Sequence, residues 1–104
     1  MPIKTYPVDI ASELQTEEEI AMFIEEAIAE AENDTDPKYL IHAFETAARA
    51  RGMLKTAKDA GLDRSGLYRA LSGQTDPRAS TLAKVANAFG YRLTFAKQNV
   101  SVSS

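Results

Sequence analysis

A chain of 104 residues, 44% of them apolar, is long enough for one domain with a single modest core. It has no cysteine, one histidine and no run of about 18 apolar residues, which excludes disulfides, thiolate metal sites and a membrane-spanning helix. With one histidine, neither a histidine-based metal site nor a catalytic triad is expected, so we predict that the chain is not an enzyme and needs no cofactor. The lack of a signal pattern predicts a cytoplasmic protein.

The net charge of −3 is divided unevenly along the chain. Residues 1–48 contain twelve acidic and two basic residues, whereas residues 49–104 contain ten basic and three acidic ones. Phosphate binding depends on the local electrostatic potential, so the second half can bind DNA although the whole chain is acidic. Charged runs also simply solvate a helix face, and that plainer interpretation suits the acidic half.

The first predicted elements are a short strand and a helix. The stretch from Ile3 to Ile10 favours an edge strand or an extended arm, because Pro7 interrupts it. Thr16 followed by Glu19 is a capping box, which predicts the start of a helix that ends near Asn33. Its apolar residues recur at helical spacing: Ile20, Phe23, Ile24, Ala27 and Ile28.

A second helix is predicted after a turn. Asp36 is expected to cap it, with Pro37 at its first position, and it runs to about Arg51 before Gly52. We expect His42, on this helix, to be a partly buried structural residue. The apolar face comprises Leu40, Ile41, Phe44, Ala47 and Ala48.

The next two predicted helices are short and close together, at Met53–Ala60 and Arg64–Leu71. Gly61 turns the chain between them, Asp63 caps the second helix, and the small Ala57 lets another helix cross closely. Leu67 and Leu71 are expected to be buried. The opposite side of the second helix presents Arg64, Ser65, Tyr68 and Arg69. This is the layout of a helix-turn-helix whose second helix enters the major groove of DNA.

Further helix and strand signals follow a polar loop at residues 72–77. A helix is predicted from Ala79 to about Phe89, ended by Gly90, and the alternating stretch from Tyr91 to Phe95 predicts a strand. The predicted fold is mainly α, with five helices and short N- and C-terminal strands. We divide it into an acidic N-terminal arm and helix (1–36), a helix-turn-helix DNA-binding domain with the C-terminal strand (37–98) and a flexible tail (99–104).

Basic residues around this motif are candidate phosphate contacts: Lys55, Lys58, Arg78 and Lys84. Each is about as well explained as a solvated side chain. Arg49 and Arg51 are weaker candidates, since Arg51 can instead pair with an acid of the N-terminal helix. Gly66 is unusual inside a helix; it either permits close approach to DNA or to a neighbouring helix, or is simply tolerated there.

Several motifs resemble a known family. The stretch from Arg49 to Phe95 resembles a helix-turn-helix domain of the Cro/CI repressor type. A wider pattern resembles the addiction-module antidote family, the HigA-like antitoxins, over nearly the whole chain: VD at 8–9, Leu14, TEEEI at 16–20, ARARGM at 48–53, GLDRSGLYRALSG at 61–73 and GYRLTF at 90–95. The resemblance implies an antitoxin that represses its own operator and neutralises a RelE-superfamily toxin, an mRNA-cutting ribonuclease encoded beside it.

The chain departs from this family's usual pattern at two positions. Leu54 and Lys55 stand where the family usually has threonine and glutamine, which alters the expected operator sequence more than the overall affinity. An alternative function is that of a stand-alone phage-type transcriptional regulator without a toxin.

The expected partners are operator DNA, the toxin and a second copy of the chain. Because one recognition helix rarely supplies enough affinity, we expect a two-fold homodimer. The strand from Tyr91 to Lys97 is its natural seam; the alternative is pairing with Ile3 to Ile10 of the same chain, and both pairings are compatible in one sheet. The acidic N-terminal helix either packs on the core, contributes to the dimer or contacts a basic toxin.

Overall fold

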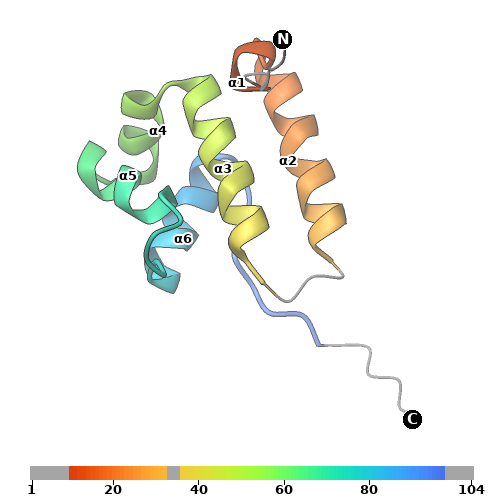
Figure 1. The fold of residues 1–104 in the computed structure, drawn as a ribbon, viewed down its shortest axis with the longest axis vertical. Coiled ribbons are helices and arrows are strands. Elements are labelled where there is room, and N and C mark those ends of the chain that lie inside the picture. Colours follow the sequence, from red (N-terminus) through yellow and green to blue (C-terminus); the bar gives the residue numbers. More distant parts are fainter. Residues whose placement is uncertain (1–9, 33–35, 98–104) are drawn as a thin grey trace, which may run out of the picture.

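The computed structural model describes residues 10–32 and 36–97. This part of the chain contains six helices and no strand: α1 (Ile10–Glu13), α2 (Glu17–Ala31), α3 (Lys38–Arg51), α4 (Met53–Ala60), α5 (Arg64–Leu71) and α6 (Ala79–Ala88). Helices α2 and α3 lie side by side, and α4, α5 and α6 gather on the other side of α3 (Figure 1). The chain is mainly helical, as predicted.

The capping box predicted at the start of α2 is present, whereas the N-cap of α3 is Pro37 and not Asp36 as predicted. Thr16 Oγ1 accepts the Glu19 N–H at 3.1 Å, and Glu19 Oε1 accepts the Thr16 N–H at 3.1 Å, which confirms the capping box. Asp36 Oδ1 accepts the Lys38 N–H at 3.0 Å. Helix α3 begins at Lys38, so Pro37 precedes the helix instead of opening it.

The core joins α2 to the other helices through α3. Ala47 and Ala48 of α3 are fully buried, and such small side chains let neighbouring helices approach closely. The Phe44 and Phe89 rings lie 5.7 Å apart, which ties α3 to the end of α6. The buried cluster comprises Ile20, Ile24, Ile41, Phe44, Ala47, Ala48, Met53, Ala57, Leu67, Leu71, Val85 and Ala86. Of the predicted core, Phe23, Ile28, Leu40, Leu82 and Phe89 are only partly buried.

Arg51, at the end of α3, connects four helices. Its guanidinium donates to both carboxylate oxygens of Glu17 in α2, from Nη2 at 2.6 Å and from Nε at 3.1 Å. It also donates to the Ala88 carbonyl oxygen at 2.6 Å and lies 4.2 Å from the centre of the Phe89 ring, at the end of α6. Asp59 of α4 lies 3.8 Å from Nη1. The predicted pairing of Arg51 with the acidic helix is therefore confirmed.

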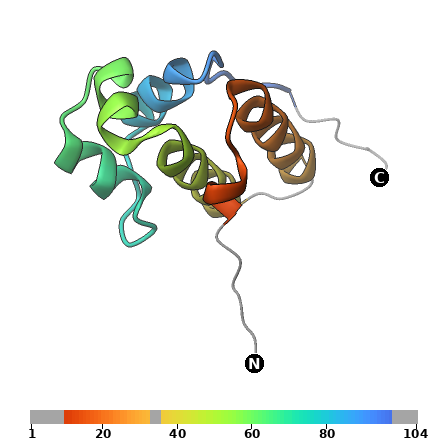
Figure 2. The same ribbon diagram turned by 90° about the horizontal axis from the view of Figure 1, so that it is seen from above.

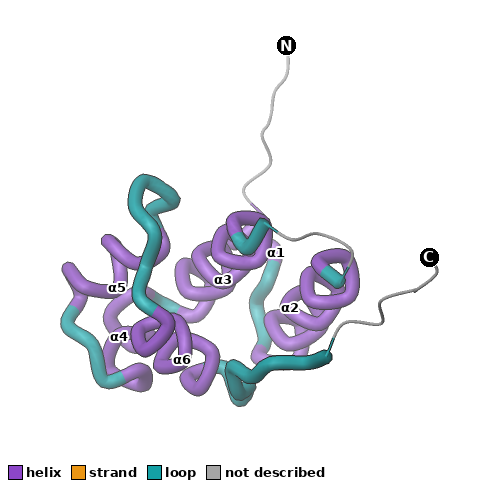
Figure 3. Tube along the Cα trace, turned by 90° about the horizontal axis from the view of Figure 1, so that it is seen from below, coloured by secondary structure: helices purple, strands orange, loops and turns teal. Residues whose placement is uncertain are grey.

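The two predicted strands differ from what the structure shows. Residues 91–97 form no strand, because a strand needs a neighbouring strand for its hydrogen bonds and the described residues supply none. Figure 3 shows this segment as a loop that passes α2, and the Tyr91 hydroxyl donates to Glu25 at 3.4 Å. Of the predicted N-terminal strand, residues 3–9 lie outside the described residues, and Ile10 instead begins α1. Helix α1 was not predicted, since four residues are too few for periodicity to show.

Candidate nucleic-acid interface

The turn between α4 and α5 is built on one glycine. Gly61 has φ +73°, a left-handed conformation that glycine adopts without strain. Its N–H bonds to the Lys58 carbonyl at 3.1 Å, and the Leu62 N–H bonds to the Ala57 carbonyl at 2.9 Å. These two hydrogen bonds form a Schellman motif, which ends α4 and reverses the chain direction immediately after it. The sequence prediction of this turn, with Ala57 buried, is confirmed.

The start of α5 is held by Asp63. Its Oδ1 accepts the Gly66 N–H at 2.7 Å, which confirms the predicted N-cap. A Cβ at Gly66 would lie 2.6 Å from this same oxygen and meets no other helix within 4 Å. The expectation of a close neighbouring helix at Gly66 is therefore wrong. The glycine instead leaves room for the capping carboxylate.

Helix α5 buries one face and exposes the other. Leu67 and Leu71 are buried, as predicted. The exposed face carries the four candidate DNA contacts, Arg64, Ser65, Tyr68 and Arg69. The guanidinium carbon of Arg64 lies 5.6 Å from the centre of the Tyr68 ring, so the two side chains support each other one turn apart. Contact of these residues with DNA stays a prediction.

Arg69 and Arg78 are brought together by the fold. Both line a hollow of about 420 Å³ between α5 and the start of α6, with Gly66 and Thr81. Helix α6 has no side-chain cap at its N-terminus. Among the described residues, no acidic side chain lies within ion-pair distance of Lys58, Arg64, Arg69, Arg78 or Lys84. Arg69 of α5 and Arg78, the residue before α6, therefore border one open hollow, which Asp63 and Asp76 also line.

Lys55 lies in a different environment. Its Nζ is 3.4 Å from Asp59 Oδ2, and its charge is close enough to Glu17 to help lower the pKa of that carboxyl group. The main cause of the lowered pKa is the hydrogen bond from Arg51. Lys55 thus sits beside acids of α4 and α2, which reduces the positive potential it can offer. Its neighbour Leu54, the other departure from the family pattern, is 68% exposed.

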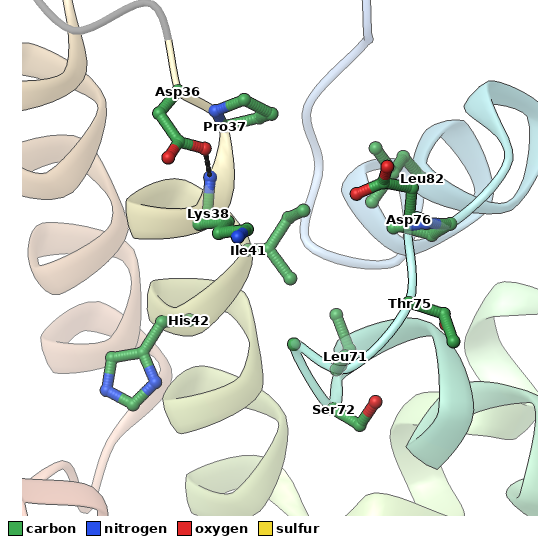
Figure 4. Close-up of a pocket in the computed structure, with 12 residues that line it drawn as sticks. Asp36, Pro37, Lys38, Ile41, His42, Leu71, Ser72, Thr75, Asp76 and Leu82 are labelled. Atoms are coloured by element: carbon green, nitrogen blue, oxygen red, sulfur yellow. Dashed lines mark hydrogen bonds between the residues drawn. The ribbon is translucent and has the colours of Figure 1, made fainter.

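His42 is not the partly buried residue that was predicted. Its side chain is 74% exposed, because it lies on the side of α3 away from the core. It lines the edge of a hollow of about 300 Å³ between α3 and the loop after α5. Figure 4 shows its ring pointing away from Leu71 and Leu82. Within residues 10–32 and 36–97, no three acidic or histidine side chains gather as a metal site would require.

No helix in the described part is long and apolar enough to cross a membrane. A family model described as "Probable addiction module antidote protein" matches residues 4–97. An uncharacterized protein of Haemophilus influenzae is 40% identical over 80 residues, which cover 77% of this chain and 78% of the relative. No solved structure matches the chain significantly.

Proposed function

The chain belongs to the family of probable addiction module antidote proteins, and we propose that it is the antitoxin of a type II toxin–antitoxin module that also represses its own operon. An antidote implies a toxin partner. The DNA-binding part of the proposal depends mainly on one observation: α5 exposes Arg64 and Arg69 on a face whose start is held by Asp63. Helix α5, which carries both arginines, and the acidic helix α2 lie on opposite sides of α3 (Figure 2).

In this proposal α4 and α5 form a helix-turn-helix of the Cro/CI type, with α5 in the major groove. Arg64, Ser65, Tyr68 and Arg69 face the base edges, where an arginine bound to guanine contributes about 1–3 kcal/mol of discrimination. Arg78 and Lys58 contact phosphates, which adds affinity but no sequence information. Lys55 contributes less than the others, because Asp59 and Glu17 offset its charge.

Repression by a homodimer is also part of the proposal. Residues 91–97 lie along the surface, with Leu93 50% exposed and Phe95 completely exposed. An extended segment with exposed apolar side chains and unpaired backbone groups pairs readily with an identical segment. A dimer that binds two half-sites needs its two copies of α5 about one helical turn of DNA apart.

The proposed toxin is a RelE-superfamily ribonuclease, which the chain binds and neutralises in the cytoplasm. Co-expression tests this directly. Cells that produce the toxin encoded beside this chain are expected to grow when the chain is co-produced, and the two proteins are expected to co-purify. If the chain binds operator DNA but neither rescues growth nor co-purifies, it is a stand-alone regulator and the antitoxin proposal is wrong.

Titration of the upstream DNA with Arg64→Ala tests the recognition helix. This variant is expected to weaken operator binding more than binding to unrelated DNA, because base contacts are lost only at the operator. Arg49→Ala is the matched control, since Arg49 is paired with Glu45 on α3 at 2.8 Å. Equal loss on both DNAs would make Arg64 a phosphate contact instead.

A further inference from the structure

A shallow groove lies between α1 and α2, on the acidic half of the molecule. Its volume is about 240 Å³, and its lining is both apolar and acidic. We call it the α1–α2 groove, and its principal lining residues are Ile10, Leu14, Met22, Phe23, Glu13 and Glu26.

The floor of the α1–α2 groove exposes more apolar surface than folding requires. Met22 is 64% exposed and Ile10 48% exposed, whereas Ile20 and Ile24 already supply the face of α2 that packs on α3. Leu14 and Phe23, which also line the groove, are partly buried and pack against the core, so the core holds the floor of the groove in place. Methionine is flexible and polarizable, which suits it to contact a partner of irregular shape. Exposed apolar side chains gathered in a groove are typical of a protein–protein contact.

The rim of the α1–α2 groove is acidic. Glu13, Glu19 and Glu26 line it, and no basic residue does. Farther along the same side of α2, Glu30 accepts a hydrogen bond from the Tyr39 hydroxyl at 2.9 Å. This bond, aided by desolvation and the charges of Glu30 and Glu26, raises the pKa of Tyr39. The surface therefore favours cations and disfavours phosphates.

The α1–α2 groove is far from the proposed DNA contacts. Figures 1 and 2 show α3 between α2 and the α4–α5 pair. A protein bound at α1 and α2 can therefore occupy the chain without covering the exposed face of α5.

We propose that the α1–α2 groove is the surface that captures the toxin, and that its occupant is a basic surface of the toxin. An apolar side chain of the toxin packs between Ile10 and Met22, and its cations lie against Glu13 and Glu26. This inference rests on the proposed function: a ribonuclease that binds mRNA must present a positively charged surface to phosphates. An acidic groove is complementary to that surface, and its binding would exclude RNA from it.

A second copy of the chain is a poorer occupant for electrostatic reasons. An isologous contact would place the acidic rims of two copies opposite each other, and like charges across an interface oppose association.

Calorimetric titration with the purified toxin, carrying an inactivating substitution, tests the proposal. Met22→Ala and Glu26→Lys are each expected to weaken toxin binding about tenfold or more, through lost apolar contact and reversed charge. Leu54→Ala is the control for Met22, because Leu54 is equally exposed but lies on α4. Glu18→Lys is the control for Glu26, because it makes the same charge change on α2 outside the groove. Both controls are expected to bind the toxin with an affinity within about threefold of wild type. Any small loss for Glu18→Lys would come from long-range electrostatic repulsion, which salt screens.

Circular dichroism should be unchanged in all four variants, and operator binding should be unchanged in the three variants on α2, which separates lost contact from lost folding. If wild type binds the toxin and both groove variants bind it equally well, the α1–α2 groove is not the toxin site, although the antitoxin function stands. If the groove variants and the controls weaken binding alike, only general charge matters and the inference is also overturned. If wild type does not bind the toxin at all, the proposed function fails together with the inference.

Discussion

Replacing Arg51 with alanine removes the side chain that connects α2, α3, α4 and α6. The Arg51 side chain is only 12% exposed, whereas the side chain of its partner Glu17 is 61% exposed. If Arg51 mattered only as the ion-pair partner of Glu17, the Arg51→Ala and Glu17→Ala variants would lose equal stability. The structure predicts that they differ, because Arg51 also contacts Ala88 and Phe89.

The magnitude follows from the separate contacts of Arg51. Its partly buried hydrogen bond to the Ala88 carbonyl is charge-assisted and contributes about 1.5–2 kcal/mol. The ion pair with the exposed Glu17 contributes at most about 1 kcal/mol, since solvent screens it. The cation–π contact between the Arg51 guanidinium and the Phe89 ring adds about 0.5–1 kcal/mol to the stability. We therefore expect Arg51→Ala to lower the free energy of unfolding by about 3 kcal/mol and Glu17→Ala by about 1 kcal/mol or less.

Urea unfolding followed by circular dichroism measures both losses, and the double variant gives the coupling energy between the two residues. Arg49→Ala is the matched control on the same helix. The part of its loss that comes from the pair with Glu45, four residues away on the same helix, is about 0.3–0.5 kcal/mol. Equal losses for Arg51→Ala and Glu17→Ala would refute the reasoning, because the contacts with α6 would then contribute nothing.

Three further predictions concern the core, the cap and pH. Leu67→Ala should lower the free energy of unfolding by about 2–5 kcal/mol because Leu67 is fully buried; thermal unfolding checks this, and a loss as small as that of the exposed Leu54→Ala would contradict it. Asp63→Ala should cost about 1 kcal/mol, whereas Asp63→Asn keeps an accepting oxygen and should cost much less; equal urea midpoints for the two variants would argue against the cap. The Arg51 hydrogen bond lowers the pKa of Glu17, so its stabilising contribution is present above the ordinary glutamate pKa and is lost as pH falls through the lowered value. Wild type should accordingly lose more stability than Glu17→Gln between about pH 5 and pH 3, and parallel pH curves would contradict this.

The helices were predictable because their signals are local. A capping box and an N-cap join residues three positions apart, and an apolar stripe repeats every turn. The bounds of Met53–Ala60 and Arg64–Leu71 are confirmed for this reason. The predicted strand at residues 91–97 was wrong, since alternation shows only that a segment can form a strand. Whether it does depends on a partner strand, which local sequence does not reveal.

The candidate site was predictable to the same extent. The period of an α-helix decides which residues of α5 share a face, so once Leu67 is taken to be buried, Arg64 and Arg69 are expected to be exposed. The shared hollow of Arg69 and Arg78 does not follow, because it depends on how α6 returns beside α5. Neither does the position of Lys55 near Glu17.

By itself the sequence determined where the chain becomes helical, where α4 turns into α5 and which half carries the negative charge, since all three depend on neighbouring residues or on composition. Only the tertiary structure decided which acid of the N-terminal helix Arg51 binds, Glu17, and that Arg51 also reaches Ala88; these residues are 34 and 37 positions away. It also decided that an apolar floor with an acidic rim opens between α1 and α2. Contacts of this kind depend on packing between separate helices, and their geometry is set only when the whole core has formed.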